Sequence, residues 1–158
     1  MLKFYAISTL IVLFDQLTKK IILTNIMFRE VIEVTTFFDI THVHNYGAAF
    51  SFLHNAGGWQ RYFLATLSLL VSVILPFYIK KNLNNLLIAI GLTLILGGAV
   101  GNLIDRFFLG YVIDFISIHV NDTFYWPVFN IADSAISIGV LLLIYDTYKK
   151  RDTSNRRK

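Results

Sequence analysis

The sequence predicts an all-α membrane protein of four transmembrane helices, with a small extracytoplasmic β-sheet cradle between helices 1 and 2. Hydrophobic residues make up 56% of the 158 residues and charged residues only 15%, with a mean hydropathy of +0.62. This composition is too apolar for an ordinary soluble domain. The apolar residues also fall into four runs, each close to the roughly 20 residues that cross a bilayer. Basic residues gather beside one set of run ends, which indicates a membrane orientation.

The first apolar run covers residues 4–23. Lys3 and the apolar stretch behind it have the pattern of a secretory signal peptide. No small-residue cleavage site follows, however, and the run continues through Asp15 and Lys19 to Leu23. We therefore expect an uncleaved transmembrane helix.

The three remaining runs complete a single domain that occupies residues 1–158. They cover residues 62–79, 86–104 and 128–148. An even number of helices places both termini on one side of the membrane, together with the short connection that contains Lys80 and Lys81. The positive-inside rule makes this side cytoplasmic, as does the basic tail 149–158. Lys19 and Lys20 lie near the opposite end of the first helix, but the other basic residues outnumber them.

The two long connections, residues 24–61 and 105–127, then face outward. Residues 31–44 are rich in β-branched and aromatic side chains and precede a turn-like Asn-Tyr-Gly, so we expect strands there. Residues 116–123 carry no motif that predicts a role. Long connections in compact proteins are often functional.

Several functional classes are disfavoured by composition. The chain has no cysteine, which excludes disulfides, thiolate catalysis and lipidation of the chain itself. Its net charge of +4 suits an anionic lipid surface, and no base-stacking motif accompanies it, so we expect no nucleic acid partner. His42 and His44 share one face of a strand, but no third ligand has a recognisable spacing, so we expect no metal. His54 and His119 are expected at the surface.

Polar residues concentrate at one level of the predicted bundle, the outer leaflet. Asp133 lies five residues beyond Val128, hence about 7 to 8 Å inside the outer end of the fourth helix. Asp15 lies about 12 Å from the outer end of the first helix at the same rise per residue. The outer end of the third helix, the connection after it and the start of the fourth helix add Asn102, Asp105, Arg106, Asp114 and Asn130.

Some of these residues have structural explanations. Asp15 and Lys19 are four residues apart on a helix, so an internal ion pair that permits membrane insertion is favoured over catalysis. Asp105 and Arg106 can be an interfacial pair as readily as site residues. Asp146 is expected to be a solvated cytoplasmic residue.

Asp114 and Asp133 have no such explanation, because both lie among apolar neighbours. Two carboxylates in a poorly solvated site share a proton, which supplies an acid and a base for amide hydrolysis. A small proton or ion transporter is the main alternative, although the inner halves of helices 2 to 4 offer few polar groups. A non-catalytic scaffold packed through Gly97 and Gly101 is a second alternative. Spacing alone does not choose among them.

Five ordered motifs resemble those of the lipoprotein signal peptidase (signal peptidase II) family, over nearly the whole chain. They are Asp15-Gln-Leu-Thr-Lys19, Asn45-Tyr-Gly-Ala-Ala-Phe50, Gly97-Gly-Ala-Val-Gly-Asn-Leu-Ile-Asp-Arg106, Val112-Ile-Asp-Phe115 and Phe129-Asn-Ile-Ala-Asp133. The resemblance implies an aspartic endopeptidase of the bacterial cytoplasmic membrane. Its substrate would be a diacylglyceryl-modified prolipoprotein, cut immediately before the lipidated cysteine.

The resemblance also implies roles for individual residues. Asp114 and Asp133 would form the catalytic dyad, while Asp15 and Lys19 would support it. The residues that bind substrate or shape the site would be Asn45, Asn102, Arg106 and Asn130. The outer sheet would cover the lipid-bearing cysteine, with the active site near the outer face. The implied partners are the prolipoprotein and membrane lipids; no cofactor is implied, and we expect a monomer.

Overall fold

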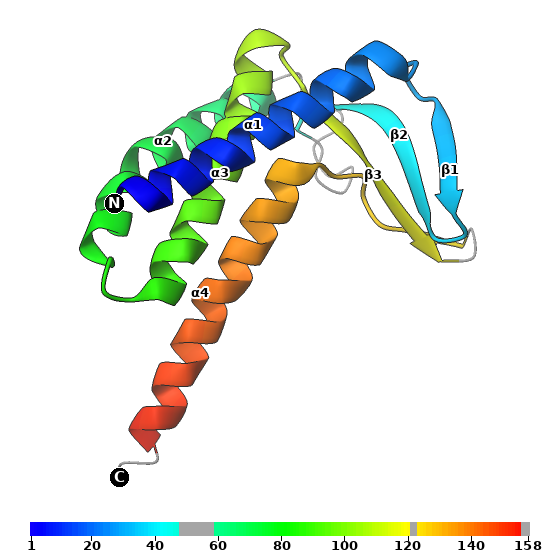
Figure 1. Cartoon of the computed structure of the whole chain (residues 1–158). Coiled ribbons are helices and arrows are strands. Elements are labelled where there is room, and N and C mark those ends of the chain that lie inside the picture. Colours follow the sequence, from blue (N-terminus) through cyan, green and yellow to red (C-terminus); the bar gives the residue numbers. More distant parts are fainter. Residues whose placement is uncertain (48–58, 121–122, 156–158) are drawn as a thin grey trace.

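The computed structural model describes residues 1–47, 59–120 and 123–155, in which four helices stand beside a four-stranded antiparallel sheet. Figure 1 shows the sheet at one end of the helices, with both termini toward the other end. The helices are α1 (Leu2–Asn25), α2 (Trp59–Lys81), α3 (Leu86–Phe108) and α4 (Ile131–Asn155). They match the four apolar runs and extend several of them by a few residues, except that α4 begins at Ile131 and not at Val128.

Three of the helices, α2, α3 and α4 up to Lys150, are long and apolar enough to cross a membrane. Helix α2 is the most exposed, with Gln60 and Ile79 as its buried residues. Apolar side chains such as Phe77 project outward from it, which is stable where lipid replaces water. Helix α1 is equally long but carries Asp15 and Lys19, both buried inside the protein.

Helix α3 is the central helix and packs against α1, α2 and α4. Its start is capped by Asn85, whose side chain accepts a hydrogen bond from the amide of Ile88, satisfying one of the free donors of a helix N-terminus. Small residues allow close packing: a Cβ added at Gly139 of α4 would lie 2.6 Å from the carbonyl oxygen of Gly91. The α3–α4 contact is therefore backbone against backbone.

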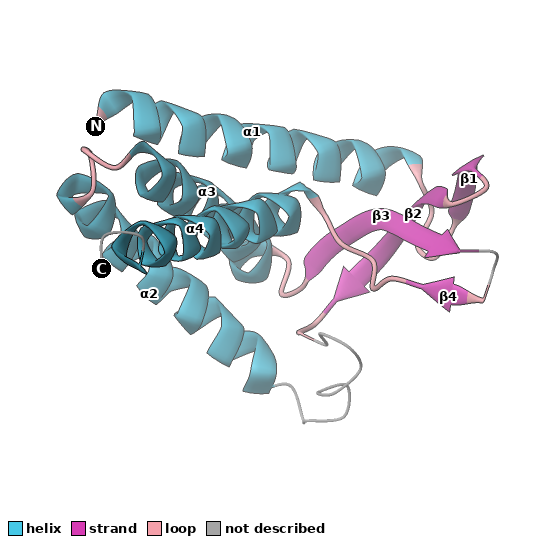
Figure 2. Ribbon diagram, turned by 90° about the horizontal axis from the view of Figure 1, so that it is seen from below, coloured by secondary structure: helices cyan, strands magenta, loops and turns pink. Residues whose placement is uncertain are grey.

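The sheet draws strands from both long connections, whereas the sequence predicted strands only between the first two helices. Its strands are β1 (Val31–Thr35), β2 (Phe38–Asn45), β3 (Val112–Val120) and β4 (Phe124–Tyr125), in that spatial order. Strand β3 was expected only as an apolar stretch around Asp114. Its β-branched residues pair antiparallel with β2, a contact between segments about 70 residues apart that local sequence does not reveal. Figure 2 shows β2 and β3 side by side.

Two expected surface residues are instead buried. His119 is 7% exposed and its Nε2 lies 3.1 Å from Asp39 Oδ2. Asp146, expected to be solvated, is 6% exposed, accepts a 2.9 Å hydrogen bond from Asn85 and pairs with Lys150 at 2.7 Å. In both cases the buried group has a charged or polar partner on another element or one turn along the helix. His54 lies outside the described residues.

The backbone contact between α3 and α4 predicts that Gly139→Ala destabilises the protein, because the new methyl group has no space and α4 must move. We expect a loss of about 1 to 3 kcal/mol in the free energy of unfolding, measured as a lower thermal unfolding midpoint in detergent. Ser137→Ala, at an exposed position of the same helix, is the matched control. Equal midpoints for the two variants would contradict the predicted close packing.

Candidate active site

Two carboxylates from different elements come together where the sheet meets the helices. Asp114 lies on β3 and Asp133 in the first turn of α4. Asn130 joins them, because its side-chain nitrogen donates to Asp114 Oδ1 at 2.7 Å while its backbone amide donates to Asp133 Oδ2 at 3.2 Å. Asp114 and Asp133 are 19 residues apart in the sequence, yet a single residue between them, Asn130, donates hydrogen bonds to both carboxylates.

Asn130 is also the residue that starts α4. Its Oδ1 accepts a 2.9 Å hydrogen bond from the backbone amide of Asp133, and its own amide donates back to the Asp133 carboxylate. This reciprocal pair is a capping box, in which the side chains at the N-cap and three residues later satisfy each other's amides. The helix therefore begins at Ile131 instead of Val128, and Asp133 lies nearer the helix end than the predicted 7 to 8 Å.

Each carboxylate receives a second amide donor. Asn45, at the end of β2, donates to Asp114 Oδ2 at 2.8 Å, and Asn102 of α3 donates to Asp133 Oδ1 at 2.8 Å. Hydrogen bonds of this kind favour the ionised form of an acid. Three of the four predicted site-shaping residues therefore contact the carboxylates. The fourth, Arg106, donates to the backbone oxygen of Asn102 at 3.3 Å, one turn away on α3.

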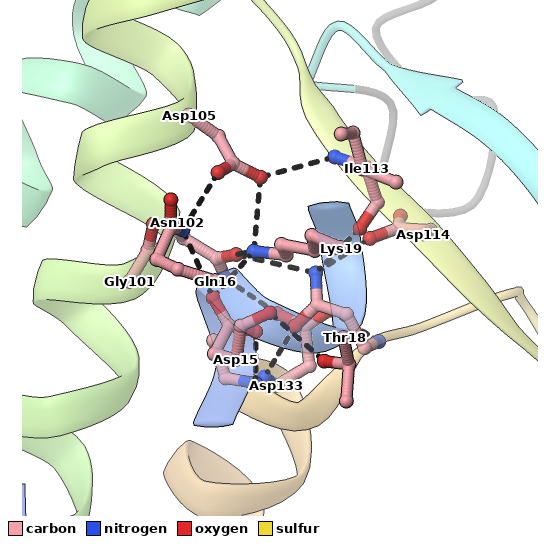
Figure 3. A network of polar contacts seen from close by, with 12 residues as sticks. Asp15, Gln16, Thr18, Lys19, Gly101, Asn102, Asp105, Ile113, Asp114 and Asp133 are labelled. Atoms are coloured by element: carbon pink, nitrogen blue, oxygen red, sulfur yellow. Dashed lines mark hydrogen bonds and ion pairs between the residues drawn. The ribbon is translucent and has the colours of Figure 1, made fainter. Parts of the chain in front are cut away.

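A buried ion network lies behind the two carboxylates (Figure 3). Lys19 Nζ is 2.8 Å from Asp15 Oδ2 and 2.9 Å from Asp105 Oδ2, and all three side chains are at most 3% exposed. Lys19 also donates to Asn102 Oδ1 at 2.9 Å. Because the amide oxygen of Asn102 is occupied by Lys19, its nitrogen faces Asp133.

The two acids of this network also hold the backbone on which the site is built. Asp15 Oδ1 accepts from the amide of Ala132 at 2.9 Å, and Asp105 Oδ2 accepts from the amide of Ile113 at 3.1 Å. These amides belong to the residues immediately before Asp133 and Asp114. The predicted ion pair between Asp15 and Lys19 is thus confirmed. It belongs to a larger network that holds the backbone next to Asp114 and Asp133.

Sequence reasoning missed Gln16 and left the role of Asp105 open. The Gln16 side chain donates to Asp105 Oδ1 at 2.8 Å and to the carbonyl of Gly101 at 3.1 Å. The sequence shows that Gln16 directly follows Asp15, but it does not show that the packing of α1 on α3 turns the Gln16 side chain toward the site. A Cβ at Gly101 would lie 2.7 Å from Asp15 Oδ2, so this glycine makes room for the network.

The two carboxylates differ in their surroundings. Asp114 is 2% exposed, and burial, followed by the nearby charge of Asp133, raises its pKa from 3.8 to about 7 despite the hydrogen bonds from Asn45 and Asn130. Asp133 is partly exposed. At neutral pH, Asp114 therefore carries a proton in a large fraction of molecules.

The described residues offer no convergence of three or more side chains suited to a metal ion. His42 is buried, its Nδ1 lies 2.9 Å from the carbonyl oxygen of Ile26, and its Nε2 lies 3.1 Å from that of His44. The ring of His44 stacks on Tyr111 with centroids 3.8 Å apart. The two histidines therefore pack with each other and with an aromatic neighbour.

Comparisons with known proteins identify a family for the chain. The model of the family described as signal peptidase (SPase) II matches residues 7–149. A lipoprotein signal peptidase of Teredinibacter turnerae is 50% identical over 92% of this chain and 87% of its own length. That of Alteromonas mediterranea is 47% identical, over 96% of this chain and 83% of its own length.

Solved structures extend the similarity to three dimensions. A bacterial membrane enzyme superimposes with a TM-score of 0.85 at 35% identity, covering 98% of this chain and 92% of that chain. A second bacterial membrane enzyme gives a TM-score of 0.80 at 34% identity, covering 93% of both chains. With a matching family model over most of its length and relatives of this identity, the chain belongs to the signal peptidase II family, the lipoprotein signal peptidases.

Proposed function

We propose that this protein removes signal peptides from diacylglyceryl-modified bacterial prolipoproteins, with Asp114 and Asp133 as its catalytic dyad. This reaction is supported by the fact that the chain belongs to the signal peptidase II family. The observation that supports the dyad is the sharing of Asn130 by two carboxylates of unequal burial. Unequal surroundings separate the proton affinities of paired acids, which is what acid and base roles require.

The chemistry follows from this inequality. Asp133, held by Asn102 and by the backbone of Asn130, takes a proton from a water as that water attacks the scissile carbonyl carbon. Asp114 gives its proton to the carbonyl oxygen, so a neutral tetrahedral diol forms. The C–N bond then breaks as Asp133 returns its proton to the leaving nitrogen of the cysteine and Asp114 recovers a hydroxyl proton from the diol.

The membrane arrangement is part of the proposal. All four helices, α1 included, would span the bilayer, because Lys19 pairs with Asp15, the one acid of α1, and such pairing makes buried charges tolerable in a membrane. Both termini would face the cytoplasm together with Lys80 and Lys81. The dyad would then lie near the outer face, where the signal peptide ends and the lipidated cysteine begins the mature protein. We propose that the protein acts as a monomer.

Separate Asp114→Asn and Asp133→Asn variants test the dyad, since each removes an acid while nearly preserving its shape. We expect each to lower the rate of prolipoprotein cleavage by at least about 10²-fold, measured with purified, folded protein. Asp146→Asn is the matched control, because it makes the same change near the far end of α4. Normal cleavage by either dyad variant would refute the assignment.

The raised pKa of Asp114 predicts the alkaline side of the pH profile. As the pH rises through about 7, Asp114 loses the proton that it must donate, so kcat/KM should fall. Because the two acids are coupled, the profile reports apparent pKa values of the pair.

The variant Asn45→Ala tests whether Asp114 is the group that causes the alkaline fall in kcat/KM. The hydrogen bond from Asn45 lowers the pKa of Asp114, so its removal should move the alkaline limb of the profile to higher pH, whatever its effect on the maximal rate. A limb that stays in place or moves to lower pH would assign the alkaline limb to another group.

A further inference from the structure

A cavity of about 580 Å³, lined by both polar and apolar side chains, lies on the sheet, outside the dyad. Its lining includes Glu33, Asp39, Ser117 and His119. Three of these form a row across adjacent strands, because Glu33 of β1 pairs with Asp39 of β2, which in turn pairs with Ser117 of β3. Paired strands of the sheet therefore form the cavity, and they place two acids, Glu33 and Asp39, side by side in its wall.

This arrangement is unfavourable for the sheet alone. Like charges directly opposite on adjacent strands are destabilising. Asp39 is 5% exposed and its Oδ2 pairs with His119, but its Oδ1 has no hydrogen bond partner among the described residues. A buried acceptor left unsatisfied costs stability, and such exceptions call for an explanation. A bound group that donates hydrogen bonds would supply the missing partner.

The cavity adjoins the dyad. Val43, which lines the cavity, is the cross-strand partner of Asp114, and such partners have Cβ atoms about 5 Å apart. Val128, two residues before the bridging Asn130, lines it as well. A polypeptide extending from Asp114 over the sheet therefore reaches Asp39 within a few residues, since the register places Asp39 opposite Ser117 on the same strand as Asp114.

Building on the proposed function, we propose that this cavity binds the substrate residues that directly follow the lipidated cysteine. The apolar signal peptide must lie along the helices, so the polar chain beyond the cut bond leaves across the sheet. Asp39 and Glu33 then favour side chains with hydrogen bond donors or positive charge, and disfavour carboxylates by repulsion. The pocket makes the enzyme selective for the first residues of the mature lipoprotein.

The test uses two diacylglyceryl-modified prolipoproteins that differ only in the two residues after the cysteine, Lys-Asn in one and Asp-Glu in the other. We expect wild-type enzyme to cleave the first with a kcat/KM about tenfold higher. Asp39→Asn should narrow this ratio. Glu33→Lys, at an exposed strand position, should reverse it by placing an ammonium group at the pocket.

Glu30→Gln is the matched control, since it removes an acid just before β1 that does not line the cavity, and it should leave the ratio unchanged. Equal cleavage of both substrates by wild-type enzyme, or a ratio unmoved by Glu33→Lys, would overturn the inference while the dyad stands. If wild-type enzyme cleaves neither substrate, the proposed function itself fails. Thermal unfolding of each variant separates misfolding from a change in selectivity.

Discussion

The contact on which the rest of the site depends is the burial of Lys19 between Asp15 and Asp105. Removing three charged groups from water is costly, and it is tolerated only where the geometry satisfies each of them. Here the network connects α1 to α3 and, through two backbone amides, to β3 and α4. Four elements that are distant in sequence are thus fixed relative to one another at a single point.

Support from this network explains how an apolar bundle can hold acids in defined positions. Lys19 orients Asn102, and Asn102 holds Asp133. On the other branch, Asp105 fixes the backbone before Asp114. Loss of one partner from a buried ion network leaves an uncompensated charge, which typically costs about 3 to 5 kcal/mol. The same residues therefore secure the fold and the relative placement of the two carboxylates.

Local sequence was sufficient for the features that depend on local pattern. Run length and composition predicted the four helices, and the four-residue spacing predicted the pair of Asp15 with Lys19. The choice of Asp114 and Asp133 among several acids required the resemblance to a known family, because their meeting depends on a bridge between Ile116 of β3 and Phe129 just before α4. Gln16, Asp105 and His119 acquire their roles only through contacts between distant elements, which no periodicity encodes. Asn130 was identified as a site residue, but its function as a helix cap became visible only in the structure.

The capping box of α4 has a consequence for how the site persists over time. Helix ends open more readily than helix centres, and here the first turn contains Asp133 while its cap contacts Asp114. Fraying of that single turn would separate the two carboxylates and release the helix terminus in one event. The lifetime of the proposed catalytic geometry is accordingly the lifetime of one helical turn, and every contact that prevents fraying there also keeps the two carboxylates together.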